Sequence, residues 1–257
     1  MPAPARIELI GLQGIPRVAP GDDLAALILH ALRESNQTLH EGDMVVVAQK
    51  IVSKAEGRRV DLRQITPTPR AHELALRSGK DPRLVELILG QSREVLRALP
   101  GSVIVVHHRG WIMANAGIDQ SNLEGNSGDD FALLLPDDPD ASAAALRDAI
   151  AQRTGRRVGV IVNDSFGRPW RQGVVGTALG VAGWPALIDR RGAPDLYGRP
   201  LTRTIIGHAD EIAAAASLVQ GQSDEGRPVV VVRGVQAGPG EGCGQDLIRP
   251  AGQDLFR

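Results

Sequence analysis

Three short runs of apolar, largely β-branched residues most constrain how this chain can fold. Met44–Ala48 (MVVVA), Val158–Val162 (VGVIV) and Val229–Val232 (VVVV) are apolar almost throughout. Valine and isoleucine favour strands, and continuous apolar runs of this length are typical of strands inside a protein. The three runs therefore predict a buried central sheet.

Amphipathic patterns and shorter apolar segments fill the chain between these runs. Helices are expected over Leu24–Arg33 (capped by Asp22 or Asp23), 71–79, 81–99, Ala143–Gln152 (starting at Asp140 or Ser142) and Asp210–Val219. Strands are expected over Ile7–Ile10, Ser102–His107, Trp111–Ala114, 131–135 and 203–206. A Gly-rich stretch, Gly167–Gly183, is assigned no strand, and its glycines three apart suit close packing of chain segments.

The mixture of hairpin-like and helix-separated strands predicts an α+β fold with mixed sheets and flanking helices. No GxGxxG motif opens a helix after the first strand, and there is no Walker A motif, so the pattern is neither Rossmann nor P-loop. No repeat or clean linker divides the chain. We expect a single domain over 1–257, in which 235–257 form a loop-like or mobile tail.

Charge and composition exclude several functional classes. Twenty-nine Lys and Arg against 30 Asp and Glu give a net charge of −1, which argues against a dedicated nucleic-acid binder. No signal peptide and no run of about 20 apolar residues is present. We expect a cytoplasmic protein with no membrane partner, in which the single cysteine, Cys243, is an ordinary free thiol.

The oxygen-rich turn Asn115–Asn122 (NAGIDQSN) is the strongest local candidate for a site. A glycine-containing turn that carries Asn, Asp and Ser side chains offers hard oxygen ligands suited to Mg²⁺ or Mn²⁺. The same residues are also explained by a polar turn in which Asp119 caps a helix or stabilises the loop.

A second candidate follows the apolar strand at Val158–Val162. Asn163, Asp164 and Ser165 stand where that strand ends, and polar residues at the carboxyl end of a buried strand recur at binding sites of open sheets. Aspartate with serine fits a Mg²⁺ site completed by substrate phosphates. A strand-ending Asx turn is the alternative.

Several cationic or constrained positions could bind anions. Arg168 and Arg171 lie three apart beside glycines and could hold a phosphate or a carboxylate. The constrained loop Gly14–Val18 precedes a helix, and Gln49, Lys50 and Lys54 follow the second strand. Each of these features is also typical of ordinary turns and solvated lysines. His107 and His108 are adjacent on a strand and point to opposite faces, which argues against a zinc site.

Taken together, these motifs resemble the coenzyme F420:L-glutamate ligase family over nearly the whole chain, from Ile7 to about Gly234. The resemblance rests on the order of eight fragments: PGDDL (20–24), VSKAEGR (52–58), NAGIDQSN (115–122), LLLPDDPD (133–140), VIVNDSFGRPWRQGVVG (160–176), DLYGR (195–199), HADEIAAAA (208–216) and VVVVRG (229–234). It implies a two-lobed, intertwined homodimer. The chain resembles the stand-alone form, without a C-terminal nitroreductase-like domain.

The resemblance also implies a reaction. GTP phosphorylates a carboxylate of the deazaflavin precursor F420-0, and the amine of L-glutamate attacks the acyl phosphate to give γ-glutamyl-linked F420. Two Mg²⁺ or Mn²⁺ ions, and K⁺ as a further cation, are implied. The alternatives are a related amide ligase with another carboxylate acceptor and a non-catalytic GTP- or deazaflavin-binding homologue.

Residue roles are implied position by position. Asp119 and Asp164 resemble the catalytic ligands of one metal, and Ser165 and Gln222 resemble ligands of the second. Gln222 stands where family members carry a glutamate, so the charge at the second metal is either missing or supplied by Asp224 or Glu225. The positions implied to contact GTP are Ile15, Pro16, Arg17, Val18, Gln49, Lys50, Lys54 and Asn122.

Overall fold

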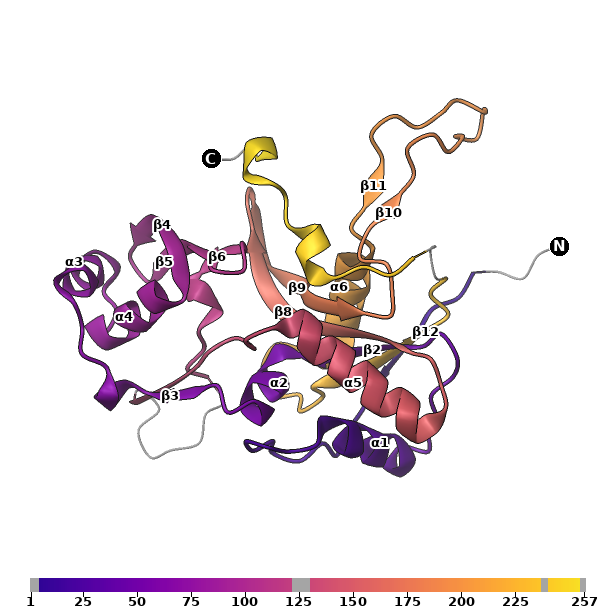
Figure 1. Ribbon diagram of the computed structural model, residues 1–257, viewed down its shortest axis with the longest axis horizontal. Coiled ribbons are helices and arrows are strands. Elements are labelled where there is room, and N and C mark those ends of the chain that lie inside the picture. The colour runs from indigo at the N-terminus through magenta and orange to yellow at the C-terminus, as the bar shows by residue number, and fades with distance from the viewer. Residues whose placement is uncertain (1–4, 122–129, 237–239, 255–257) are drawn as a thin grey trace.

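The structure is a computed structural model that describes residues 5–121, 130–236 and 240–254 (Figure 1). Its larger lobe is built on a five-stranded sheet in the order β1-β12-β2-β8-β9. The strands are β1 (Glu8–Gly11), β12 (Val229–Arg233), β2 (Met44–Ala48), β8 (Gly159–Arg168) and β9 (Arg171–Ala182). Only β2 and β8 run parallel, and the other pairs are antiparallel.

Both faces of this sheet are covered, as the apolar runs predict. Val45 and Val47 of β2 point to a core shared with α1 (Leu24–Glu34) and α5 (Pro139–Thr154). Met44 and Val46 point to a second core shared with α6 (His208–Gln220). The alternation of side chains along each strand therefore feeds two separate cores, one on each face.

The smaller lobe lies to the left in Figure 1 and has its own core. It consists of α3 (Pro69–Ser78), α4 (Pro82–Gly90) and the sheet β4-β5-β6, with β4 (Ser92–Leu99), β5 (Ser102–His107) and β6 (Ile112–Ala114). The lobes are connected by the helix α2 (Gln49–Ala55) and by an antiparallel pair of strands, β3 (Arg59–Asp61) and β7 (Phe131–Leu133). A 3-10 turn, η1 (Leu62–Gln64), follows β3.

Several expectations about secondary structure are wrong. The helix expected over 81–99 ends at Gly90, and Ser92–Leu99 is β4, because it pairs with β5 across a turn where Gly101 has φ 83°. The stretch Gly167–Gly183 contains the whole of β9 rather than irregular chain. The fifth helix begins at Pro139, capped by Asp138, because proline fits the first turn of a helix.

Glycines in β9 permit the close packing that their spacing predicts. A Cβ on Gly176 would lie 2.4 Å from the carbonyl oxygen of Ala213 in α6, and one on Gly180 would lie 2.1 Å from that of Pro139 in α5. Helices on opposite faces of the sheet therefore contact the same strand backbone.

A slender arm extends from the large lobe, and the C-terminal tail lies against β9 of that lobe (Figure 1). The arm is formed by the antiparallel pair β10 (Ile188–Asp189) and β11 (Ile205–Ile206) with the loop between them. The segment expected to be a tail carries two short 3-10 turns, η4 (Gly244–Leu247) and η5 (Ala251–Gln253). Its Gly244 amide donates a hydrogen bond to Asp140 at 2.6 Å.

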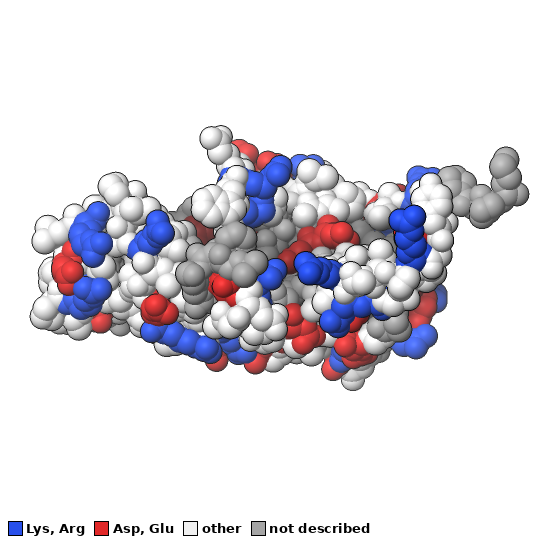
Figure 2. Space-filling view, turned by 90° about the horizontal axis from the view of Figure 1, so that it is seen from above, with Lys and Arg blue, Asp and Glu red and all other residues white. Residues whose placement is uncertain are grey.

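The α+β prediction is thus confirmed, and the mixed sheet matches neither a Rossmann nor a P-loop winding. Across the described parts of the chain, no helix has both the length and the apolar character needed to cross a membrane. Acidic and basic side chains are interspersed over the face seen in Figure 2, in keeping with the net charge near zero.

Candidate active site

The site begins where β2 ends beside its parallel neighbour β8. The strand that was expected to end at Asn163–Ser165 instead continues to Arg168 because it pairs with β9, so Asp164 and Ser165 lie within β8. Ala48, the last residue of β2, pairs in register with Asn163 of β8. Gln49 and Lys50, which follow β2, therefore lie beside Asp164 and its neighbours. Carboxyl ends of parallel strands are a common place for ligands in open sheets, because the strand ends leave a crevice.

Asp119 comes to the same place from the other side. It follows the 3-10 turn η2 (Asn115–Gly117) and forms an isolated bridge with Leu133, in which each backbone N–H donates to the other's carbonyl oxygen at 3.0 and 2.8 Å. The side chain of Asn115 also accepts a hydrogen bond from the Val103 amide at 3.0 Å. The turn predicted as a metal loop is thus fixed to both β5 and β7.

Lys50 joins the two halves of the site. Its Nζ lies 2.5 Å from Oδ2 of Asp119 and donates a hydrogen bond to Oγ of Ser121 at 2.8 Å. The Ser121 amide donates to Oδ1 of Asp119 at 2.7 Å. Burial raises the pKa of Asp119, but the hydrogen bonds from Lys50 and Ser121 outweigh it and leave that pKa below its ordinary value. Asp119 is therefore charged at neutral pH.

The pKa of Asp164 is shifted in the opposite direction. Burial, reinforced by the charge of Asp119, raises the pKa of Asp164 to about 7, although hydrogen bonds from the Ser165 backbone and the Gln49 side chain oppose the change. Gln49 is itself buried, and its Oε1 accepts a hydrogen bond from Ser53 at 2.9 Å. Two neighbouring carboxylates in such an enclosure disfavour each other's negative charge, so Asp164 holds its proton to a higher pH than Asp119 does.

A polar cavity of about 490 Å³ opens over these residues. Every described position implied to contact GTP lines it, from two separate segments: Ile15, Pro16, Arg17, Val18, Gln49, Lys50 and Lys54. The described metal candidates line it too, namely Asp119, Asp164, Ser165 and Gln222. Asn122 lies outside the described residues. The fold thus brings candidates from five parts of the sequence to one cavity.

The loop after α6 forms one wall of the polar cavity. Gln222, Asp224 and Glu225 all line it, and Glu225 accepts a hydrogen bond from the Ser223 amide at 2.8 Å. Both acidic side chains are therefore available on the same wall as the neutral Gln222.

A second cavity of about 530 Å³ adjoins the first. The two share Gln49, Asp119, Asp164 and Ser165 as lining residues, so the acidic pair stands at their junction. The remaining walls of the second cavity are mainly apolar and come from both lobes: Ile104, Ile112, Met113, Ala114, Phe166 and Val174. Arg168 also lines it, whereas Arg171 is exposed on β9 and is not among the residues that line either cavity.

Comparison with known proteins identifies the family of the chain. A family model described as F420-0:Gamma-glutamyl ligase matches residues 13–234. The chain belongs to this family. It is 48% identical to the coenzyme F420:L-glutamate ligase of Methanothermobacter thermautotrophicus over 98% of this chain and 99% of that protein. Proteins of the same name from Methanopyrus kandleri and Methanocaldococcus jannaschii are 44% and 41% identical, each over 98% of this chain and 97% of the relative.

Sequence analysis singled out Asn163 and Asp164, but it assigned no role to the buried Gln220 that lies behind them. Nδ2 of Asn163 donates a hydrogen bond to Oε1 of Gln220 at 2.6 Å, and Nε2 of Gln220 donates to the carbonyl oxygen of Pro228 at 3.2 Å. Gln220 was not expected, because a glutamine at the end of an Ala-rich helix gives no signal of burial. The pair ties α6 to the floor of the polar cavity.

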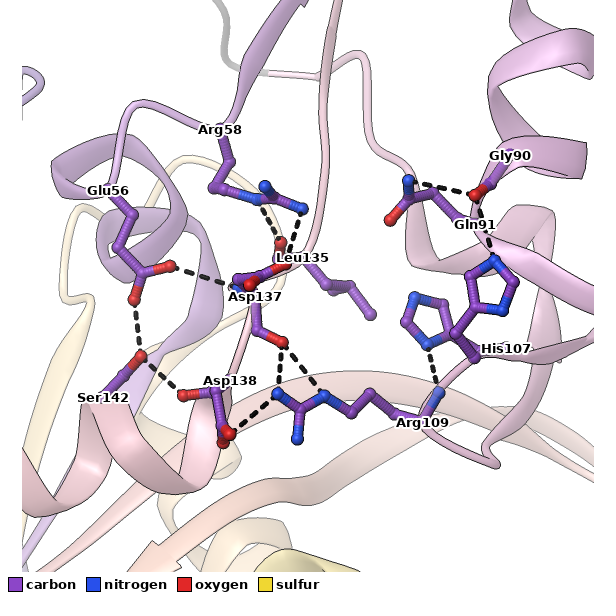
Figure 3. A network of polar contacts seen from close by, with 11 residues as sticks. Glu56, Arg58, Gly90, Gln91, His107, Arg109, Leu135, Asp137, Asp138 and Ser142 are labelled. Atoms are coloured by element: carbon purple, nitrogen blue, oxygen red, sulfur yellow. Dashed lines mark hydrogen bonds and ion pairs between the residues drawn. The ribbon is translucent and has the colours of Figure 1, made fainter.

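A set of polar contacts holds the small lobe against the large one (Figure 3). We call Glu56, Arg109, Asp137, Asp138 and Ser142 the interlobe clasp. Arg109, in the turn between β5 and β6, donates two hydrogen bonds to the carbonyl oxygen of Asp137 at 3.0 and 2.6 Å and forms an ion pair with Asp138 at 2.8 Å. Glu56 of α2's end accepts hydrogen bonds from Ser142 and from the Asp137 amide.

The histidine pair lies beside the interlobe clasp. Burial, with the charges of His108 and Arg109, lowers the pKa of His107 to about 4, so its ring is neutral at physiological pH. Its Nδ1 accepts a hydrogen bond from the Arg109 amide at 3.0 Å (Figure 3). His107 thereby shapes the turn from which Arg109 reaches the large lobe.

Proposed function

We propose that this protein ligates L-glutamate to the deazaflavin precursor F420-0 at the expense of GTP. The relatives named coenzyme F420:L-glutamate ligase support the overall reaction, since they match nearly the whole chain. The observation that carries the proposal is the placement of Asp119 and Asp164 at the junction of a polar and an apolar cavity. A nucleotide in the first and an acceptor in the second would meet at this pair.

The oxygen donors fit one or two Mg²⁺ or Mn²⁺ ions. Asp119, Asp164, Ser165 and Gln222 are hard ligands, and Lys50 already supplies positive charge beside Asp119. In the parts of the chain that are described, no group of three or more His, Cys, Asp or Glu could hold a metal ion. We infer that phosphate oxygens and water complete the coordination, as is usual for Mg²⁺. Bound there, the ions would neutralise the triphosphate.

The proposed reaction has two steps, for which the protein's own residues bind and orient the reactants. Lys50, which lies beside Asp119 and lines the polar cavity, would bind a phosphate there and offset its charge. In the first step an acceptor carboxylate oxygen attacks the γ-phosphorus of GTP, and GDP leaves. In the second, the glutamate amine attacks the acyl carbon, inorganic phosphate leaves with the bonding electrons, and a proton passes from nitrogen to solvent. Enclosure of the acceptor between the lobes keeps water from hydrolysing the acyl phosphate.

Purified protein with GTP, Mn²⁺ or Mg²⁺, glutamate and F420-0 tests this proposal. Formation of GDP together with a product heavier by a glutamyl group is the expected result. Asp164→Ala should abolish both while the protein stays folded, and Asp148→Ala, an exposed change on α5, should retain both. If the wild-type protein binds GTP but forms no GDP, the chain is a non-catalytic homologue. If GDP forms only with another carboxylate, the acceptor is different.

We further propose that two copies associate through the arm. Leu196 is fully exposed and Tyr197 nearly so at its tip, where Asp195 accepts hydrogen bonds from the amides of Tyr197 and Arg199 and thereby fixes the turn. A rigid tip that presents two large apolar side chains fits burial in a partner. Light scattering of the wild type should give a dimer and Leu196→Asp should give a monomer. An unchanged mass for Leu196→Asp would contradict the role of the arm.

A further inference from the structure

The apolar cavity between the lobes has an apolar surface that no other part of the described chain covers. Ile112 of β6 is 40% exposed and Val174 of β9 is 51% exposed, although both line this cavity together with Phe166. Exposed apolar side chains gathered in a concave site are typical of a ligand pocket. A volume of about 530 Å³ is large enough for a fused ring system.

Arg168 brings an unsatisfied cation to this same cavity. Its Nη1 is buried and has no hydrogen-bond partner among the described residues, while Nη2 donates only a long hydrogen bond, 3.3 Å, to the carbonyl oxygen of Gln172. Arg168 as a whole is half-buried, but a guanidinium nitrogen that is removed from water without an acceptor is costly, and an anion beside it offsets that cost. The cavity is therefore suited to a ligand with negative charge.

The two polar features of the cavity lie apart from each other. Asp164 and Arg168 are four residues apart on β8, which corresponds to roughly 13 Å along an extended strand. The apolar side chains of both lobes occupy the walls around them. A ligand that fills the cavity thus needs an apolar body, one group that reaches the acidic pair, and a separate anionic group for Arg168.

We propose that this cavity binds the acceptor of the ligase reaction, with its planar ring between the lobes and an anionic group other than the reacting carboxylate bound by Arg168. The assignment rests on the proposed function for the identity of the acceptor. It follows from charge complementarity and from size. All described positions implied to contact GTP line the other cavity, and of these only Gln49, at the junction, also lines this one, whereas glutamate alone is too small to cover these walls. Arg168 is thus a specificity-determining residue.

Equilibrium binding separates the contribution of the arginine from that of the walls. The probes are F420-0, which carries the anionic chain, and the same deazaflavin ring with a neutral polyol chain, each measured without nucleotide. Arg168→Gln should weaken F420-0 by about 10- to 100-fold, the range for a hydrogen-bonded charge pair, and should leave the neutral probe unchanged. Ile112→Asp should weaken both probes, because it removes apolar wall.

Two further variants make the comparison specific. Arg168→Lys keeps the charge but loses the planar fork of donors, so an intermediate loss of F420-0 affinity is expected. Arg97→Gln, at an exposed position on β4, is the matched control and should bind both probes as the wild type does. The affinity for GTP should be unchanged in all four variants, and thermal unfolding checks that each is folded.

The outcomes separate this inference from the proposed function. If the wild type forms product but Arg168→Gln binds F420-0 normally, or loses affinity for GTP instead, the assignment of Arg168 is overturned and the ligase activity stands. If Arg168→Gln selectively loses F420-0 but the wild type forms no GDP, the cavity is assigned correctly and the reaction is not.

Discussion

Replacing Asp164 by asparagine should make the protein more stable while it abolishes turnover. In the folded protein, burial and the nearby charge of Asp119 raise the pKa of Asp164 from 3.8 to about 7. The charged carboxylate is therefore unfavourable in the folded state at alkaline pH. Asparagine has almost the same shape and no charge, so the variant is free of this cost. A residue that lowers stability in this way is expected where function requires it.

The sign and size of the effect follow from linkage. An acid whose pKa rises on folding binds its proton more tightly in the folded state, so its ionisation destabilises the protein. The cost is absent below about pH 4, grows between pH 4 and 7, and is constant above. The change from 3.8 to about 7 corresponds to about 4 kcal/mol at pH 8. Because Asp164 retains some contact with solvent, we expect Asp164→Asn to gain about 2 kcal/mol.

Urea unfolding with a chelator present, from pH 5 to pH 8, measures this gain. The difference in unfolding free energy between Asp164→Asn and the wild type should increase with pH, whereas Asp148→Asn should show no such trend. When the chelator is replaced by Mn²⁺, the metal should stabilise the wild type and not Asp164→Asn, because only the wild type retains both carboxylates. Equal stability at pH 8, or a gain that does not change with pH, would refute the reasoning.

Three further changes test other parts of the structure. Gly180→Ala should lose about 2 kcal/mol or more in urea unfolding, because its Cβ would meet the Pro139 carbonyl oxygen at 2.1 Å, whereas Gly90→Ala, with open space around it, should lose nothing. Arg109→Ala should lower the free energy of unfolding by about 1 kcal/mol, since the ion pair of Arg109 is partly exposed. It should also raise KM for the acceptor in steady-state kinetics. An unchanged KM would show that the interlobe clasp does not shape the acceptor cavity. Lys50→Gln should weaken GTP about 10-fold or more by calorimetry, and an undiminished affinity would rule out a phosphate contact.

Local pattern was sufficient for elements whose burial and ends are set by neighbouring residues. Met44–Ala48 was predicted with its bounds, and the helix expected over Leu24–Arg33 spans Leu24–Glu34, with Asp23 accepting the capping hydrogen bond from the Ala26 amide at 3.0 Å. A strand that is apolar on both faces, and a side-chain cap beside a helical period, each depend on residues close in sequence.

Ser92–Leu99 shows where local pattern fails. Its residues suit a helix as well as a strand, and the choice was made by β5, which pairs with it through a turn at Gly101. The strand β9 is similar, because its glycines read as loop while α5 and α6 require them for close approach. Strand pairing is decided by a partner that the local sequence does not name.

By itself, the sequence determined the buried strands, most helices and the chemistry of the candidate ligands, because residue type and spacing fix hydrophobic period, caps and donor atoms. It singled out Asp119 and Asp164 as candidate oxygen ligands. Only the tertiary structure decided that Lys50 and Ser121, 71 residues apart, meet beside Asp119. It also decided that burial raises the pKa of Asp164 to about 7 and that Arg168 lines an apolar cavity. Distances between loops and the removal of water depend on how the two lobes pack, and no short-range pattern encodes that packing.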